Sequence, residues 1–282
     1  MTGRRAATLR RFLVRAALAI AGLYLLAVGA ACTFQRSMVY LPDPKPVAPD
    51  PSGPKVQVVN LTTPDGERLV AWFLPPAPGK PVLLYFGGNG EGLNWQTDNL
   101  RQIARAGVGT LDVAYRGYSG STGHPTEAGL HTDAEAAYAW LTARYKPQDI
   151  VISGHSLGAA VAVRLASEHP ARALALEAPF TSALDMGELE FPWAPVRLLM
   201  WDRFESDRRI GEVRMPVLIV HGDQDEVIPF AQGQALFALA NQPKAFVRVP
   251  GGHHDDLPSH GFYDDLWRFL GIAPAAAAGS TT

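Results

Sequence analysis

Ser156 lies at the centre of the pentapeptide GHSLG at positions 154–158, which fits the pattern G-x-S-x-G. An apolar run at 150–153 precedes it and a helical stretch at 157–167 follows it, which is the strand–turn–helix context of a nucleophilic serine. Glycines flank the turn because a sharp, strained backbone leaves no room for neighbouring side chains. The turn also places the hydroxyl at a helix N-terminus, where a developing negative charge is stabilised. The sequence predicts Ser156 as a nucleophile, the alternative being a Gly-rich turn with a chance serine.

A serine hydroxyl needs a base to remove its proton, and the base needs a carboxylate to orient it. After a nucleophile elbow of this kind, the acid and then the histidine follow along the chain. Asp223 and Asp225 follow the apolar run at 217–221. Asp223 comes directly after a glycine and suits a turn-capping role. We therefore expect Asp225 to be the acid and Asp223 to be its structural neighbour.

Two adjacent histidines, His253 and His254, follow the last apolar run at 245–249. The glycines before them give the chain a flexible approach to His253. We predict His253 as the base, and His254 is the close rival because only spacing separates the two. His155 is next to the serine but is expected to point the wrong way for a base.

An oxyanion requires two backbone donors. One is expected from Leu157, which follows the nucleophile. The other is expected from the GGNG loop at 87–90, after the apolar run at 81–86, with Asn89 as the donor. The alternative for this loop is an ordinary Gly-rich turn.

Short apolar runs alternate with helical stretches from residue 55 onward, and these elements must position the residues named above. Continuous apolar strands separated by helices predict an α/β fold with a mostly parallel, eight-stranded sheet covered by helices on both faces. A turn signal at 63–66 predicts an antiparallel hairpin at the start of the domain. The expected strands are 56–61, 68–73, 81–86, 109–113, 150–153, 173–177, 217–221 and 245–249. The expected helices are 94–106, 133–144, 157–167, 231–239 and 262–271.

The segment at about 180–210 is too long for a simple connection, so we expect an inserted cap over the sheet. Its sequence FPWAPVRLLMWDRF contains Phe191, Trp193 and Trp201. These aromatics are expected either to line an acyl pocket or to pack the cap onto the sheet. The whole catalytic domain is expected to cover residues 55–273, followed by a disordered tail at 274–282.

The N-terminus has the pattern of a membrane anchor. Residues 1–15 contain five arginines and no acid, and residues 16–35 carry no charge. Twenty helical residues reach ~30 Å, about the thickness of the hydrocarbon core. The arginine excess before the span predicts a cytoplasmic N-terminus and a catalytic domain on the outer side. The alternatives are a cleaved signal peptide or lipidation at Cys32. Residues 36–54 are rich in proline and predict a stiff, extended linker to the domain.

Composition excludes several function classes. The net charge is −2 and charged residues make up 18% of the chain, so there is no bulk charge to attract nucleic acid. Cys32 is the only cysteine, which rules out an internal disulfide and a thiolate zinc site. We expect neither a metal nor an organic cofactor, and the oligomeric state stays open.

The chain resembles the α/β-hydrolase superfamily over residues 56–272. The motifs that carry the resemblance are FQRSMVYLP, which follows the apolar span, and, within that range, LDVAYRGYSGSTG, GHSLGAAVAVRLA, PVLIVHGDQDEVIPF and GGHHDD. More narrowly, the chain resembles small membrane-anchored serine hydrolases of the serine-aminopeptidase-like and acyl-thioesterase-like kinds. The resemblance implies a triad of Ser156, Asp225 and His253, with Asn89 and Leu157 at the oxyanion hole. Gly87 replaces a histidine that relatives usually carry. Arg116 and Tyr118 match a family loop that is mostly architectural.

These features predict a serine hydrolase of carboxylic esters or thioesters that works through an acyl-enzyme on a small-molecule or acyl-group substrate. A serine aminopeptidase or amidase is the first alternative, although no acidic cluster for an α-ammonium group is evident in the cap. A catalytically silent, membrane-tethered binding protein is the second.

Overall fold

Eight strands form one sheet in the order β1-β2-β4-β3-β5-β6-β7-β8. The computed structural model describes residues 2–273 of the chain. Strand β2 runs antiparallel to both of its neighbours, and all other neighbouring strands are parallel. The strands are β1 (Gln57–Thr62), β2 (Arg68–Leu74), β3 (Val82–Phe86), β4 (Gly109–Val113), β5 (Ile150–His155), β6 (Ala173–Glu177), β7 (Val217–Gly222) and β8 (Lys244–Val249). This arrangement confirms the predicted mostly parallel α/β sheet.

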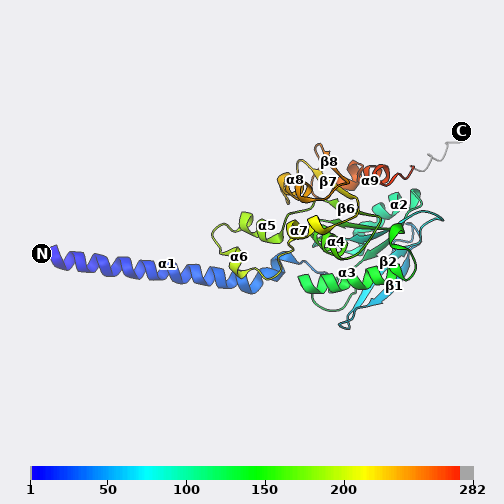
Figure 1. Cartoon of the computed structure of the whole chain (residues 1–282). Helices are drawn as coiled ribbons and strands as arrows, with labels where there is room; N and C mark the ends of the chain where they lie inside the picture. Colours follow the sequence, from blue (N-terminus) through cyan, green and yellow to red (C-terminus); the bar gives the residue numbers. More distant parts are fainter. Residues whose placement is uncertain (1, 274–282) are drawn as a thin grey trace.

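Helices cover both faces of the sheet (Figure 1). They are α2 (Thr97–Arg105), α3 (Glu127–Thr142), α4 (Leu157–Glu168), α8 (Phe230–Leu239) and α9 (Phe262–Leu270). Successive strand residues point to opposite faces, so Leu83 and Val151 pack in the apolar cluster that contains α9, whereas Leu84 and Ile152 pack in the cluster that contains α3 and α4. Strands β3 to β7 are buried along their whole length, which explains their continuous apolar sequences.

The eight expected strands match the observed ones to within two residues at each end. The largest difference among the expected helices is at α3, which begins at Glu127 and not at residue 133. The hydroxyl of Thr126 accepts a hydrogen bond from the Gly129 N–H and caps this earlier start. The helix expected from residue 94 begins with a 3-10 turn over Leu93–Gln96 before α2.

Helix α1 (Thr2–Val39) projects from the rest of the molecule (Figure 1). Its stretch Ala7–Val39 is long and apolar enough to cross a membrane, with a mean hydropathy of 2.1 and none of the apolar window buried. The helix continues four residues into the expected linker. The segment after it lies against the domain, since Tyr40 is buried and the Asp43 carbonyl accepts a hydrogen bond from the Ser119 N–H at 2.8 Å. The proline-rich segment is therefore partly packed and is not a free spacer.

The segment between β6 and β7 contains three short helices, α5 (Ala183–Glu190), α6 (Val196–Leu199) and α7 (Ser206–Arg209). Helices α5 and α6 lie beside the part of α1 that is nearest the domain (Figure 1). We refer to residues 180–210 as the cap. The tail expected to be disordered, 274–282, lies outside the described residues.

Candidate active site

Ser156 occupies a strained turn between β5 and α4. Its φ of 53° and ψ of −118° lie in a region that residues with side chains rarely adopt. A Cβ at Gly154 would collide with the carbonyl of Gly158, and a Cβ at Gly158 would collide with the carbonyl of Phe86. The two glycines therefore allow α4 to approach β5 and β3 closely enough to form this turn.

A chain of hydrogen bonds joins Ser156 to an imidazole and a carboxylate. The Nε2 atom of His254 lies 3.0 Å from the Ser156 Oγ, and its Nδ1 atom lies 2.8 Å from Asp225 Oδ2. The His254 side chain is 7% exposed and that of Asp225 is fully buried. This is the geometry in which a histidine can take the proton of a serine while a carboxylate holds its other nitrogen.

The surroundings of Asp225 keep its carboxyl group ionised. Burial alone would raise its pKa, but hydrogen bonds from His221 and His254 and from the Ile228 N–H hold the pKa well below the usual range. Its Oδ1 atom accepts the backbone N–H groups of Val227 at 2.9 Å and Ile228 at 2.7 Å. The carboxylate is thus fixed in place and negatively charged, as the orienting partner of a histidine must be.

The histidine prediction is wrong by one position. His253 lies outside the hydrogen-bond chain, with its side chain 56% exposed and its Nδ1 atom 3.0 Å from Glu226 Oε2. The hydrogen bond that the His253 ring donates to the Glu226 carboxylate raises the pKa of His253. The backbone explains the difference, because the His253 N–H is held by Asp256 Oδ1 at 2.7 Å and the next residue is the one that turns toward Ser156. The sequence contains no local signal that separates the two histidines.

Asp223 has the structural role expected of it. Its Oδ1 atom accepts the Gly251 N–H at 2.8 Å, and its Oδ2 atom lies 2.7 Å from a guanidinium nitrogen of Arg248. The carboxylate therefore ties the loop after β7 to the loop that carries His253 and His254.

The two expected oxyanion donors lie in elements next to Ser156. Leu157 is the first residue of α4, so its N–H has no intrahelical acceptor. A Cβ on Gly88 would lie 3.4 Å from the Ser156 Cβ, which places the 87–90 loop against the serine. The Asn89 carbonyl accepts hydrogen bonds from the Tyr118 hydroxyl at 2.6 Å and the Leu41 N–H at 3.2 Å.

The local structure explains why position 87 is a glycine. A Cβ there would lie 2.8 Å from a carboxylate oxygen of Glu91. The Tyr115 hydroxyl donates to the Gly87 carbonyl at 3.2 Å. The Glu91 side chain thus fills the space into which a larger residue at 87 would project.

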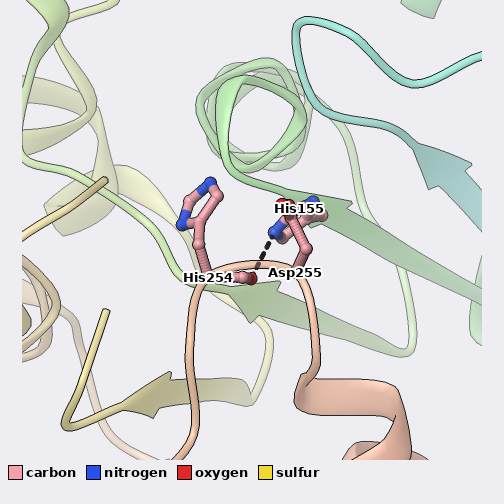
Figure 2. A group of neighbouring side chains, drawn as sticks. All are labelled: His155, His254 and Asp255. Carbon is pink, nitrogen blue, oxygen red and sulfur yellow. Dashed lines mark hydrogen bonds between the residues drawn. The ribbon is translucent and has the colours of Figure 1, made fainter. Parts of the chain in front are cut away.

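His155 holds the loop that carries His254 through a hydrogen bond to its backbone, a role that the sequence did not suggest. Its Nδ1 atom is paired with Glu91, and its Nε2 atom lies 3.0 Å from the His254 carbonyl (Figure 2). Burial would lower the pKa of His155, but the Glu91 carboxylate raises it to about 9. An N–H donor on His155 therefore holds the backbone of the residue whose ring faces Ser156.

Among the residues that the structure describes, two groups of side chains have the composition of a metal site. The first is His155, His254 and Asp255, whose candidate ligand atoms lie within 4.8 Å of one another (Figure 2). Both ring nitrogens of each histidine already have a partner, so a metal there would break the contacts to Ser156 and Asp225. The second group, His131, Glu135 and Glu168, lies on α3 and α4 away from Ser156.

Comparisons with known proteins agree with this architecture. Residues 80–208 match the family model described as "alpha/beta hydrolase fold". The chain is 37% identical to an uncharacterized protein of Mycobacterium tuberculosis, over 90% of this chain and 95% of that protein. It is 33% identical to human alpha/beta hydrolase domain-containing protein 17B, over 74% of this chain and 72% of the human protein. An esterase of Pyrococcus furiosus has a similar fold, with a TM-score of 0.65, 17% identity, and coverage of 82% of this chain and 97% of that chain.

The family match, the relatives and the eight-stranded sheet with its turn at Ser156 lead to one conclusion. The chain belongs to the α/β-hydrolase superfamily.

Proposed function

We propose that this protein is a membrane-anchored serine hydrolase that cleaves carboxylic esters or thioesters. The observation that carries the proposal is the hydrogen-bond chain from Ser156 Oγ through His254 to Asp225, with distances of 3.0 and 2.8 Å. Hydrogen-bonded groups of this kind activate a serine that would otherwise be inert at neutral pH.

In the proposed mechanism, Ser156 attacks the acyl carbon while His254 takes its proton. The ionised Asp225 stabilises the imidazolium that forms and keeps its ring oriented. His254 then protonates the leaving alcohol or thiol, which leaves an acyl group on Ser156. A water molecule, deprotonated by His254, attacks this ester and releases the carboxylic acid.

Negative charge develops on the acyl oxygen in both steps. The backbone N–H groups of Leu157 and Asn89 are proposed to stabilise it. Leu157 contributes the free N-terminus of α4 as well as its own donor. Asn89 belongs to the 87–90 loop, which packs on Ser156 through Gly88.

Membrane anchoring is proposed from α1. Five arginines precede its uncharged stretch, so the N-terminus is assigned to the cytoplasm and the catalytic domain to the outer side. The helix is long and apolar enough to span a membrane, and none of its apolar window is buried in the protein alone. A bilayer around this segment would remove those apolar side chains from water.

Solved proteins of similar fold support ester chemistry, since they include an esterase of Pyrococcus furiosus, whose structure is known in three crystal forms. Another neighbour is an acylaminoacyl peptidase of Pyrococcus horikoshii. Amide cleavage is therefore the alternative that a substrate panel must separate from ester cleavage.

The test uses the full chain in detergent micelles. A fluorophosphonate probe should label the wild-type protein covalently, and Ser156→Ala should abolish the labelling, because the probe requires an activated serine. Ser182→Ala is the control, since the Ser182 hydroxyl caps α5 by accepting the Asp185 N–H. Hydrolysis is then measured on p-nitrophenyl esters, an acyl thioester and an aminoacyl anilide. Turnover of the anilide alone would assign an amidase, and absence of labelling in the folded protein would assign a silent binding protein.

A further inference from the structure

A mainly apolar cavity of about 530 Å³ lies between α1 and the cap. This volume is within the range of small-molecule sites, roughly 300–1,000 Å³. One wall is the anchor helix, through Val28, Ala31, Cys32 and Met38, and the other is the cap, through residues that include Phe191 and Met200. Segments about 160 positions apart in sequence thus enclose one space.

Specific contacts hold α1 against the cap. The Tyr24 hydroxyl donates to the Trp193 carbonyl at 3.2 Å. Gln35 donates to the Leu199 carbonyl at 3.2 Å and accepts the Trp201 N–H at 2.8 Å. Helix α1 is therefore docked on the cap from Tyr24 to Gln35, and it serves as more than a flexible tether.

An ion pair closes the end of this interface nearest the domain. Arg36 Nε lies 2.9 Å from Asp202 Oδ2, and the Arg36 guanidinium lies 5.2 Å from the centre of the Trp201 ring. A charge-assisted contact at the last turns of α1 fixes the rotation of the helix, and so fixes which of its faces lines the cavity.

The outer part of the cavity, lined by Val28, Ala31 and Cys32, lies at the level of the uncharged stretch of α1. The docked segment, residues 24–35, belongs to the stretch 16–35 that carries no charge. At ~1.5 Å per residue, it covers about half the ~30 Å hydrocarbon thickness of a bilayer. Large apolar side chains of the cap are exposed around it, among them Leu189, Trp193, Leu198 and Trp201. The Arg197 charge in this part of the cap is paired with Glu188 at 2.7 Å.

The inner end of the cavity approaches the hydrolytic residues. Val39, at the end of α1, lines the cavity, and its carbonyl accepts a hydrogen bond from the side chain of Asn89. Val227 also lines it, and its N–H is bound by the Asp225 carboxylate. The cavity therefore leads from the membrane-level surface of the cap toward the loops that flank Ser156.

We propose that this cavity receives the acyl chain of an ester or thioester embedded in the same bilayer, and that α1 is the wall that selects its length. The inference rests on the proposed hydrolase function and adds that the substrate comes from the bilayer in which the protein is anchored. Each methylene moved into an apolar site contributes about 0.8 kcal/mol. An anchor helix that forms the pocket would present the substrate to Ser156 without extracting the chain into water.

The first test compares two substitutions at adjacent alanines of α1. Ala31→Trp places an indole in the cavity, whereas Ala30→Trp places the same group at an exposed position that does not line it. The full chain is reconstituted in nanodiscs, and kcat/KM is measured for p-nitrophenyl acetate and palmitate. Ala31→Trp should lower the palmitate-to-acetate ratio of kcat/KM at least tenfold, and Ala30→Trp should leave that ratio at the wild-type value. An unchanged ratio in Ala31→Trp, or an equal change in both variants, would overturn the proposal.

The second test does not depend on turnover. The Ser156→Ala protein in vesicles is irradiated with a diazirine-bearing palmitate, and cross-linked peptides are identified by mass spectrometry. The palmitate probe should become cross-linked to residues within 28–39 and within 191–200. Ala31→Trp should abolish this cross-linking, and Ala30→Trp should leave it unchanged. Cross-links confined to exposed positions of α1, such as Leu25 and Leu26, would refute an acyl site even if the protein hydrolyses esters. If the cavity is cross-linked but the wild-type protein hydrolyses no ester or thioester, the acyl site stands and the hydrolase proposal is rejected.

Discussion

The side-chain amide of Asn89 donates a hydrogen bond to the carbonyl of Val39, the last residue of α1, at 3.1 Å. The proposed oxyanion loop is therefore tied to the end of the proposed membrane anchor. Asn89 is bound on its other side as well, because its carbonyl accepts the Tyr118 hydroxyl at 2.6 Å. The position of the loop thus depends on two segments outside the sheet.

Asn89→Ala tests the importance of this tie. It keeps the backbone N–H but removes the contact to Val39, so the donor should be less well placed. We expect kcat for ester hydrolysis to fall about 10- to 100-fold with little change in KM, less than the roughly 10²–10³-fold effect of deleting a donor. Asn60→Ala, at an exposed position on β1, is the control. A wild-type kcat in Asn89→Ala would show that the side-chain contact does not position the loop.

The adjacent histidines provide a matched pair. His254→Ala should lower kcat at least about 10³-fold, because it removes the base from Ser156. His253→Ala should keep kcat within a few-fold of the wild type, since His253 is exposed and bonded to Glu226. Steady-state kinetics on a short-chain ester and fluorophosphonate labelling both report the difference. The reverse ranking would return the role of base to His253.

Arg116 is expected to stabilise the fold without taking part in the reaction. Its guanidinium contacts the fully buried Asp133 at 2.8 Å and the half-exposed Asp65 at 2.8 Å. Arg116→Met would leave the Asp133 carboxylate buried without its cation, at a cost of about 3–5 kcal/mol in unfolding free energy. Asp65→Asn should cost at most about 1 kcal/mol, because that partner remains in contact with water. Urea denaturation of both variants measures the difference, and equal losses would contradict the assignment.

Glu177 should make stability depend on pH. Burial raises its pKa to about 8, and its Oε1 atom has no hydrogen-bond partner within the described part of the chain. Between the unfolded pKa, about 4.3, and about 8, the unfolded chain loses this proton while the folded chain retains it. The free energy of unfolding should therefore fall as pH rises through that window, by up to about 1.4 kcal/mol per pH unit from this group.

Glu177→Gln removes this titration. Relative to the wild type, the variant should become progressively more stable from pH 5 to pH 8 in urea unfolding. Glu212→Gln, at an exposed position, should follow the wild-type profile. Parallel profiles for the wild type and Glu177→Gln would show that Glu177 is already ionised in the folded protein at pH 5.

Much of the scaffold could be predicted from the sequence because the signals are local. Strands buried on both faces must be apolar throughout, and the runs at 109–113 and 173–177 coincide with β4 and β6. The turn at Ser156 is local too, since its steric requirements fall on two glycines within five residues. Asp225 follows a strand and binds the N–H groups of its own loop, so its place could be found from the chain order.

The tertiary structure decided which histidine faces Ser156. His253 and His254 are identical in type and adjacent, and their directions depend on groups far along the chain. Asp256 holds the His253 N–H, Glu226 binds the His253 ring, and His155 supports the His254 carbonyl. The cavity between α1 and the cap has the same origin, because Ala31 and Phe191, which are 160 positions apart, line one space only after the chain has folded. Local sequence determines backbone conformation through sterics and burial, whereas the direction of a side chain in a loop follows from partners that only the folded chain brings near.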